Sequence, residues 1–297
     1  MTFTQLEIFA LVAELRGFTA AALRLSISQS AVSHAIRALE QELGVGLVRR
    51  DPAGVELTDI GRDLLVQARQ ILGLAEGMAQ QAAAARGLRR GTLRIGSFGP
   101  TSSLRLLPPL LAAFAEAHPG IEVHVEEGTD QQVLDGLLDR RVEIGFVVLP
   151  ENRFDTLPLV EDQLVALVPR GHPLAEQAAL PLAALCDDPF ILTAAGSAPL
   201  VSGVFAAARL SPRIRYRTGQ LLSTLAQVEA GLGITLVAEL ALPAADAGRP
   251  AGYVSRPLAP PVRREVGLAL LDEAAASPAA RAFLAIARRL QREGRFG

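Results

Sequence analysis

The 297-residue chain contains no lysine and no tryptophan, and only one cysteine. Without lysine, neither a Schiff base nor a phosphate-binding lysine is available. All 29 cationic side chains are arginines, whose guanidinium groups suit phosphate and carboxylate oxygens. Cys186 cannot form an internal disulfide, and the four histidines lie too far apart in sequence for a metal motif. We therefore expect no metal site and no cofactor.

Long hydrophobic runs are also missing. The first residues lack the basic start and apolar run of an export signal, and no later segment approaches the roughly 18 uninterrupted apolar residues of a membrane span. Half of the residues are hydrophobic, 20% are charged and the net charge is only -2, so the chain can form two or more globular domains. These features favour a cytoplasmic protein without membrane contact.

The common catalytic patterns are missing as well. The sequence has no Gly-x-Ser-x-Gly elbow, and Gly231-x-Gly233 is not followed by the third glycine of a dinucleotide fingerprint. The adjacent acids Glu126-Glu127 and Asp187-Asp188 would point to opposite sides of a strand, which does not suit a catalytic pair. We expect no catalytic residue and no enzyme activity. A transport-type solute receptor remains an alternative for the later two-thirds of the chain.

Apolar residues recur at helical spacing in three stretches of the first 58 residues. They are Leu6, Phe9, Val12 and Ala13, then Ala21, Ala22 and Leu25, then Val32, Ile36, Leu39 and Leu43. Ser26 and Ile27 form a tight turn before the third stretch, and Ser28 can cap the third helix. The pattern predicts three helices that pack around one core.

The opposite side of the third helix carries hydrogen-bonding side chains. They are Gln29, Ser30, Ser33, His34 and Arg37. An α-helix fits the major groove of DNA, where glutamine can pair with adenine, arginine or protonated histidine with guanine, and serine with bases or phosphates. We therefore predict that this side, with Ser28 at the helix N-terminus, binds double-stranded DNA.

A short hairpin is predicted after the third helix. Asp51-Pro-Ala-Gly54 has the residues that a type I turn prefers, so Val48–Arg50 and Val55–Leu57 should pair as a wing. Arg49 and Arg50 could contact a phosphate or enter the minor groove. Through residue 60, however, five arginines are outnumbered by seven acidic residues, so DNA binding would require local clustering of charge and two copies. A three-helix packing module with a polar outside remains the alternative.

Residues 59–90 are predicted to form one long helix. Between Thr58, a suitable N-cap, and Gly87, a suitable stop, there is no proline, and apolar residues recur in steps of four and three, as in a coiled coil. This seam consists of Leu64, Ala68, Ile71, Ala75, Met78, Ala82 and Ala85. Small alanines allow a second helix to approach closely, which favours dimerisation over a core helix of a single globule.

Residues 91–297 alternate short apolar runs with amphipathic stretches, which predicts an α/β sheet with parallel strands. The first series has strands at 92–97, 121–125 and 142–148 and helices at 104–118 and 131–139. The second has strands at 164–169, 190–193, 214–217 and 234–237 and helices at 200–208 and 221–230. A strand at 266–271 and a helix at 278–291 follow a proline-rich stretch. We predict two lobes, about 91–162 with 266–297 and about 163–265, with a cleft between them.

Over essentially its whole length, the chain resembles the LysR-type transcriptional regulators. The densest matches are Ala21-Ala22, Ser28-Gln29, Ala31-Val-Ser33, Leu39-Glu40 and Leu57-Thr58, and later Leu93-Arg-Ile-Gly96, Gly171-His-Pro-Leu174 and Gly231-Leu-Gly-Ile234. The resemblance implies a winged helix-turn-helix DNA-binding domain at 1–58, a dimerisation linker helix at 59–90 and a two-lobed effector-binding domain, similar to periplasmic binding proteins, at 91–297. It also implies a homodimer or homotetramer. The chain departs from the family pattern at two positions. Val48 stands where the family usually has phenylalanine, which concerns the packing of the wing. His34 stands where arginine is frequent, which concerns the identity of the base that is contacted.

In open α/β sheets, ligands bind beyond the carboxyl ends of the strands. Thr101, Ser102 and Ser103 follow the first strand of this region, beside amides that begin the next helix and suit an anionic group. Thr129, and Ser197 in the other lobe, occupy positions similar to those that line the effector pocket of LysR regulators. We predict that these five residues bind a small-molecule effector with an anionic group. Helix capping is the alternative role for each.

Overall fold

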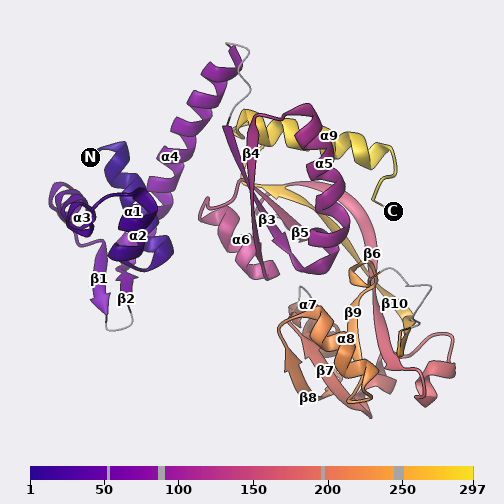
Figure 1. The fold of residues 1–297 in the computed structure, drawn as a ribbon. Helices are drawn as coiled ribbons and strands as arrows, with labels where there is room; N and C mark the ends of the chain where they lie inside the picture. Colours follow the sequence, from indigo (N-terminus) through magenta and orange to yellow (C-terminus); the bar gives the residue numbers. More distant parts are fainter. Residues whose placement is uncertain (52–53, 86–90, 195–197, 244–250, 297) are drawn as a thin grey trace. The chain divides into compact units, whose positions relative to one another are not determined.

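The computed structural model describes residues 1–51, 54–85, 91–194, 198–243 and 251–296 (Figure 1). The chain divides into two compact units. One comprises Met1–Gly91 with Leu138–Arg141, and the other comprises Thr92–Leu137 with Val142–Gly297. Within the described ranges, no helix combines the length and apolar character needed to cross a membrane.

The first unit contains three short helices, a hairpin and a long helix. Its elements are α1 (Phe3–Leu15), α2 (Phe18–Leu25), α3 (Gln29–Leu43), β1 (Val48–Asp51), β2 (Gly54–Leu57) and α4 (Asp59–Ala85). The three predicted helices are confirmed, and Val32, Ile36 and Leu39 of α3 lie in their shared core. Leu43 was expected there too, and this was wrong. It remains 37% exposed, because α3 ends at that residue, before the left-handed Gly44.

The hairpin root and the start of α4 are joined through Thr58. β1 and β2 pair antiparallel in the predicted register, with Val48 opposite Leu57; turn residues 52–53 lie outside the described residues. Thr58 caps α4 as predicted, since its Oγ1 accepts from the Gly61 amide at 2.9 Å. The same hydroxyl donates to the Gly46 carbonyl at 2.7 Å, and the Thr58 amide donates to the Leu47 carbonyl at 3.0 Å. The predicted stop at Gly87 lies outside the described ranges.

The predicted seam of α4 divides into two parts. Ala68 is 2% exposed and Leu64 is partly buried, and both pack against the core of the first unit. This part of the seam therefore packs within its own chain and is not available to a second helix. Farther along the helix, Ile71 is 36% exposed and Met78 is 73% exposed, together with Leu74 at 66%, which the seam pattern did not include.

The second unit contains a six-stranded sheet in the order β4-β3-β5-β10-β6-β9 and a two-stranded sheet of β7 and β8. Its strands are β3 (Gly91–Phe98), β4 (Ile121–Gly128), β5 (Ile144–Leu149), β6 (Asp155–Pro169), β7 (Pro189–Thr193), β8 (Arg213–Thr218), β9 (Thr235–Ala238) and β10 (Tyr253–Leu270). Its α-helices are α5 (Leu107–Ala117), α6 (Asp130–Leu138), α7 (Ala198–Ala207), α8 (Leu221–Glu229) and α9 (Pro278–Arg292). Short helical turns are η1 (Thr101–Leu106), η2 (Pro173–Glu176), η3 (Leu182–Cys186) and η4 (Glu239–Ala241).

The large sheet is mixed, whereas parallel strands were predicted. β3 and β5 are parallel, but β10 runs antiparallel to β5 and β6, and β6 runs antiparallel to β9. β6 and β10 are also much longer than predicted. The sequence suggested a break around Pro257 and Pro261, but β10 continues through it with a register shift between Pro257 and Val262. Prolines are tolerated in a strand at such irregularities.

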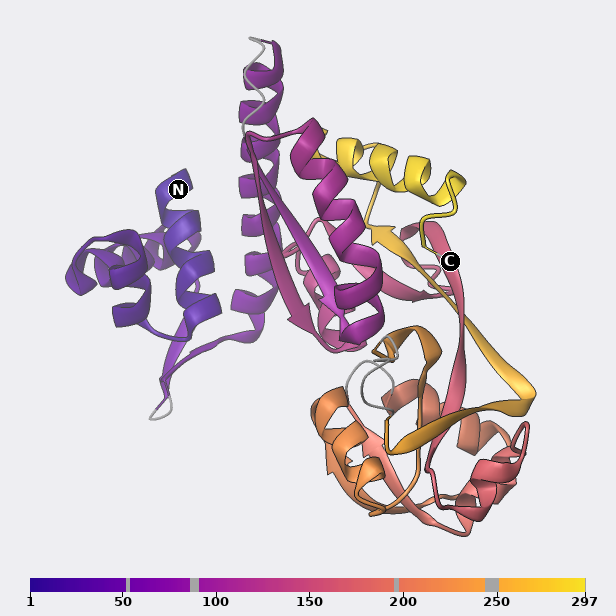
Figure 2. The same cartoon turned by 45° about the vertical axis from the view of Figure 1, so that its right-hand side comes forward.

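The long strands β6 and β10 run from one hydrophobic core to a second (Figures 1 and 2). In the first core, α5 and α9 pack together, with the Phe114 and Phe283 rings 5.4 Å apart. A smaller cluster that includes Leu137 of α6 and Val147 of β5 lies on the other face of the sheet. The second core contains residues of α7, α8, β7 and β9. The predicted two-lobed α/β architecture is confirmed.

Candidate DNA-binding interface and effector region

Gln29, Ser30, His34 and Arg37 form an exposed polar strip on α3, called here the α3 edge. The opposite side of the helix is fixed in the core, since Val32, Ile36 and Leu39 are at most 1% exposed. Ser28 caps the helix as predicted: its Oγ accepts from the Ala31 amide at 3.1 Å and lies 2.9 Å from Ser30 Oγ. The polar side chains of the α3 edge are therefore held at the surface by a helix that cannot rotate.

Ser33 lies beneath this surface. It is only 5% exposed, and its Oγ accepts a hydrogen bond from Gln29 Nε2 at 3.0 Å. The sequence predicted that Ser33 shares the exposed side with its neighbours, and in this respect the prediction was wrong. The i, i+4 spacing that joins Gln29 and Ser33 is visible in the sequence, but the burial of Ser33 depends on how α3 is rotated against the core.

Among the described side chains of the hairpin, Arg49 is the one that carries a positive charge. Arg49 is exposed on β1, opposite Glu56 of β2. The neighbouring Arg50 lies opposite Val55, and its side chain lies outside the described structure.

Several acidic residues of the first unit are engaged within the protein. Glu40 Oε1 accepts from the amides of Leu47 and Val48 at 2.7 and 3.2 Å, which attaches the hairpin to α3. Glu42 pairs with the amino group of Met1, and Asp59 pairs with Arg62. These acids therefore have structural partners and do not belong to the α3 edge, which weakens the objection raised by the acidic excess of this module.

The loop after β3 is more enclosed than predicted. Thr101 is 2% exposed and Ser102 is fully buried, because residues 101–106 form a π-helical turn that leads into α5, three residues before the expected start at Leu104. The Ser102 hydroxyl donates to the Phe98 carbonyl and accepts from Ser97 Oγ at 3.0 Å, and Ser103 Oγ lies 2.9 Å from the same Ser97 oxygen. Ser102 was predicted to lie before the helix, and this was wrong, because the helical turn already begins at Thr101.

Thr129 is exposed and caps α6. Its amide donates to Gln132 Oε1 at 2.8 Å, and its Oγ1 accepts from the Gln132 amide at 3.3 Å, which is a reciprocal capping box. This is the alternative role considered from the sequence, and it leaves an effector contact untested. Ser197 lies outside the described residues.

A buried ion pair, missed in the sequence, joins β10 to β6 beside Thr101. Arg264 Nε and Nη2 donate to Asp162 Oδ2 at 2.9 and 2.7 Å, and Nη2 also donates to Thr101 Oγ1 at 2.7 Å. The two charged side chains are 2% and 0% exposed. Asp162 Oδ1 accepts from the amides of Gln163 and Leu240, so the pair also holds η4. In the sequence, the pair is visible only as one aspartate and one arginine about a hundred residues apart. Only the register of β6 and β10 shows that Asp162 and Arg264 lie side by side.

Asp130, the residue after Thr129, belongs to the same region. It is partly buried, and its Oδ1 has no hydrogen-bond partner within the described structure. Burial raises the pKa of Asp130 from 3.8 to about 6, although a hydrogen bond from its own backbone amide and the charge of Arg264 both act to lower it. Arg264 Nη1 is the second buried atom here without a partner in the described residues.

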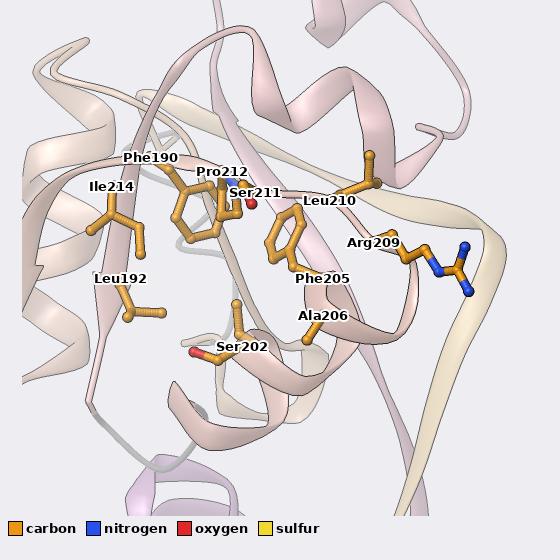
Figure 3. A pocket seen from close by; sticks show the side chains of 11 residues that line it. Phe190, Leu192, Ser202, Phe205, Ala206, Arg209, Leu210, Ser211, Pro212 and Ile214 are labelled. Carbon is orange, nitrogen blue, oxygen red and sulfur yellow. The ribbon is translucent and has the colours of Figure 1, made fainter.

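A groove of about 450 Å³ lies elsewhere, between α7 and β8 (Figure 3). Its floor contains Phe190 and Phe205, whose rings are 5.4 Å apart and nearly perpendicular, while Arg209 at its rim points away from them (Figure 3). The described residues of the predicted effector site do not line this groove. Its apolar floor and outward-pointing cation do not suit an anionic ligand.

Both parts of the chain match known protein families. Residues 3–62 match the model of the bacterial regulatory helix-turn-helix protein, lysR family, and residues 86–292 match the LysR substrate binding domain. The probable HTH-type transcriptional regulator LrrA of Synechococcus elongatus is 36% identical over 298 residues and 99% of each chain. The uncharacterized HTH-type transcriptional regulator YvbU of Bacillus subtilis is 34% identical over 291 residues, 98% of this chain and 99% of YvbU.

Solved structures agree over the full length. A full-length OxyR variant from Pseudomonas aeruginosa superposes with a TM-score of 0.73 at 26% identity, covering 98% of both chains. Full-length CbnR in complex with its target DNA gives a TM-score of 0.63 at 28% identity, covering 97% of this chain and 99% of CbnR. The helix-turn-helix match at residues 3–62 argues against the solute-receptor alternative. Since both family models match this chain and these relatives match it over nearly its whole length, the chain belongs to the LysR family of DNA-binding transcriptional regulators with an effector-binding domain.

Proposed function

We propose that the chain binds its operator as a dimer, with the α3 edge of each copy in the major groove. We also propose that a small molecule changes this binding when it binds beside Thr101, Asp130 and Arg264, called here the effector region. The observation that carries the proposal is the exposure of Gln29, His34 and Arg37 on a helix whose opposite side is held in the core. A helix fixed in this way presents its polar side chains in one orientation, which sequence-specific contact with base edges requires.

The side chains of the first unit suit different parts of the DNA. Gln29 and His34 have the donors and acceptors that distinguish base pairs, whereas Ser28 and Ser30 lie at the helix N-terminus, where amides favour phosphate oxygens. Arg37, Arg49 and Arg50 suit phosphates or guanine edges. Ser33 supports the amide of Gln29 from below. The dimer rests on the exposed apolar residues of α4.

Gel-shift titration of the full chain with the DNA upstream of its own gene tests this proposal. We expect salt-sensitive retardation, because contacts to phosphates release counterions. Arg49→Ala or Arg50→Ala should weaken binding to all sequences and reduce the salt slope by about 1. Gln29→Ala or His34→Ala should instead change the preference at one base pair by roughly 1 to 3 kcal/mol. Equal, sequence-independent losses in both classes of variant would show that α3 does not contact bases.

Catalysis is not part of the proposal, in keeping with a family of transcriptional regulators. Turnover of an effector by the purified chain would contradict it. The effector itself should alter the gel shift without being consumed, so its concentration after incubation with the protein provides the measurement.

A further inference from the structure

Two buried polar atoms of the effector region have no hydrogen-bond partner in the described structure, and they are of opposite kinds. Arg264 Nη1 is a donor and Asp130 Oδ1 is an acceptor. Arg264 as a residue is only 6% exposed, and its Nε and Nη2 are already used by Asp162 and Thr101. Polar atoms that are buried without partners are uncommon in folded proteins and call for an explanation.

The two atoms share one electrostatic environment without bonding to each other. Thr101, which accepts from Arg264 Nη2, follows the end of β3, and Asp130 follows the end of β4, the neighbouring strand of the sheet. The charge of Arg264 acts to lower the pKa of Asp130, but Arg264 Nη1 and Asp130 Oδ1 form no hydrogen bond within the described structure. The orientation of Nη1 is fixed, because the planar guanidinium is held on its other nitrogens by Asp162 Oδ2 and Thr101 Oγ1. A molecule between the two groups would have to accept from one and donate to the other.

The charges restrict the class of that molecule further. Asp162 neutralises Arg264 within the ion pair, so these two side chains and an ionised Asp130 together carry a net charge of minus one. A purely anionic ligand would therefore meet a repulsive field, whereas a ligand that also carries an ammonium group would not. This differs from the sequence-based expectation of an effector with an anionic group alone.

We infer that Arg264 and Asp130 recognise the two charged groups of an α-amino acid. The ammonium group of the ligand donates to Asp130 Oδ1, and its carboxylate accepts from Arg264 Nη1. The inference rests on the proposed function, since it names the chemical class of the effector. Charge-assisted hydrogen bonds of this kind are shorter and stronger than neutral ones, and their geometry confers specificity.

The position of Arg264 also connects ligand binding to the rest of the unit. Its partner Asp162 holds the Leu240 amide of η4, and Arg105 of η1 donates to the Leu242 carbonyl at 3.1 Å. These bonds join the segment that contains Thr101 to a segment of the second core. A ligand that binds Arg264 Nη1 therefore contacts the network that fixes η1 against η4, and it shifts any equilibrium between arrangements of that network toward the one it prefers.

Thermal unfolding of the full-length protein, with each standard L-amino acid added in turn, tests the inference. We expect at least one amino acid to raise Tm. Its 2-oxo acid, which lacks the ammonium group, and its decarboxylated amine should raise Tm little or not at all. Calorimetric titration of the same amino acid into Asp130→Asn should show an affinity about tenfold lower or worse. Asp135→Asn, an exposed position on the same helix, is the matched control and should bind like the unaltered protein.

Three results would overturn the inference: no amino acid raises Tm, the 2-oxo acid binds as tightly as the amino acid, or Asp130→Asn binds like Asp135→Asn. A high-resolution crystal structure grown with the amino acid that shows only a bridging water between the two atoms would also overturn it. These failures are separate from failure of the proposed function. Gel-shift retardation of operator DNA that persists without any amino-acid response leaves the DNA-binding proposal intact.

Discussion

At the scale of single residues, the proposed effector region contains two carboxylates in unequal surroundings, the buried Asp162 and the partly buried Asp130. Asp162 has both oxygens hydrogen-bonded and pairs with Arg264, whereas Asp130 keeps one oxygen without a partner in the described structure. A carboxylate that leaves water without gaining enough hydrogen bonds favours its protonated form. The raised pKa of Asp130, about 6, expresses this difference.

Asp130 should therefore make folding stability depend on pH. Because its folded pKa is above the unfolded value of 3.8, ionisation opposes folding: the effect is absent below 3.8, develops as the pH rises to about 6 and is complete above that. Asp130→Asn should raise the free energy of unfolding by roughly 2 to 3 kcal/mol at pH 7.5 and change it little near pH 4. Urea unfolding at both pH values provides the measurement, with Asp135→Asn as control. A gain of equal size at both pH values would rule out ionisation as the cause.

Ser33 provides a second prediction at this scale. If it positions Gln29, then Ser33→Ala should change base preference at the same operator position as Gln29→Ala, although Ser33 itself is buried. The double variant should resemble Gln29→Ala, with a coupling energy of about 1 kcal/mol or more in a double-mutant cycle. Competition gel shifts with operators altered at single base pairs measure this. Additive effects, or effects at different positions, would indicate that the two side chains act independently.

At the scale of elements, the junction between the hairpin and α4 depends on a glycine. A Cβ on Gly61 would lie 2.1 Å from the Leu47 carbonyl oxygen and 2.9 Å from Thr58 Oγ1, so only glycine allows the helix to begin so close to β1. Gly73, later in the same helix, has open space around the corresponding position.

The two glycines should respond to alanine in opposite ways. Gly61→Ala should destabilise the protein by more than roughly 3 kcal/mol, since backbone and cap must both move. Gly73→Ala should stabilise it by up to about 1 kcal/mol, because alanine has the higher helix propensity. Denaturant unfolding of both variants gives the comparison. Similar values for the two substitutions would contradict the close approach at Gly61.

The exposed apolar side chains of α4 lead to a prediction about the proposed dimer. Leu74→Glu or Met78→Glu places a charge among residues that we propose to lie against a second helix, so both should shift the protein toward monomer by about tenfold or more in dissociation constant. Gly73→Glu carries the same charge on a different side of the helix and serves as control. Analytical ultracentrifugation over a range of concentrations measures the shift, and unchanged dissociation in the Leu74 and Met78 variants would exclude this surface.

The periodicity of the sequence predicted most elements of the fold, and the errors have physical causes. Apolar spacing located α1, α2 and α3, and turn chemistry located the hairpin with its register. β10 was predicted only in its last part because Pro257 and Pro261 resemble a chain break, and local pattern contains no sign that the strand resumes after a register shift. Similarly, only the packing of η1 reveals that Ser102 is buried.

At the scale of the whole molecule, the site depends on residues that are distant in sequence. Arg264 lies 102 positions from Asp162 and 163 from Thr101, and the register of β6 and β10 brings them together. The α3 edge, in contrast, is local: helical spacing predicted that Gln29, Ser30, His34 and Arg37 lie together at the surface, but it did not predict the burial of Ser33. Local sites can thus be predicted from periodicity, whereas sites made between strands require the topology.

Whole-molecule coupling leads to a reciprocal prediction. If the effector changes DNA affinity by some factor, saturating operator DNA must change effector affinity by the same factor, typically about 5- to 150-fold for coupling of 1 to 3 kcal/mol. Calorimetric titration of effector with and without operator, compared with gel shifts with and without effector, measures both. Unequal factors would mean that a further equilibrium, such as a change in assembly, takes part.

The hydrogen bonds of Thr58 have a mechanical consequence for DNA binding. Because one side chain and its own amide hold both the hairpin root and the first turn of α4, the wing is coupled directly to the long helix. In a dimer paired through α4, a change in the angle at which the two long helices cross would increase or decrease the distance between the two hairpins. The separation of the two half-sites in a preferred operator would then report the crossing angle.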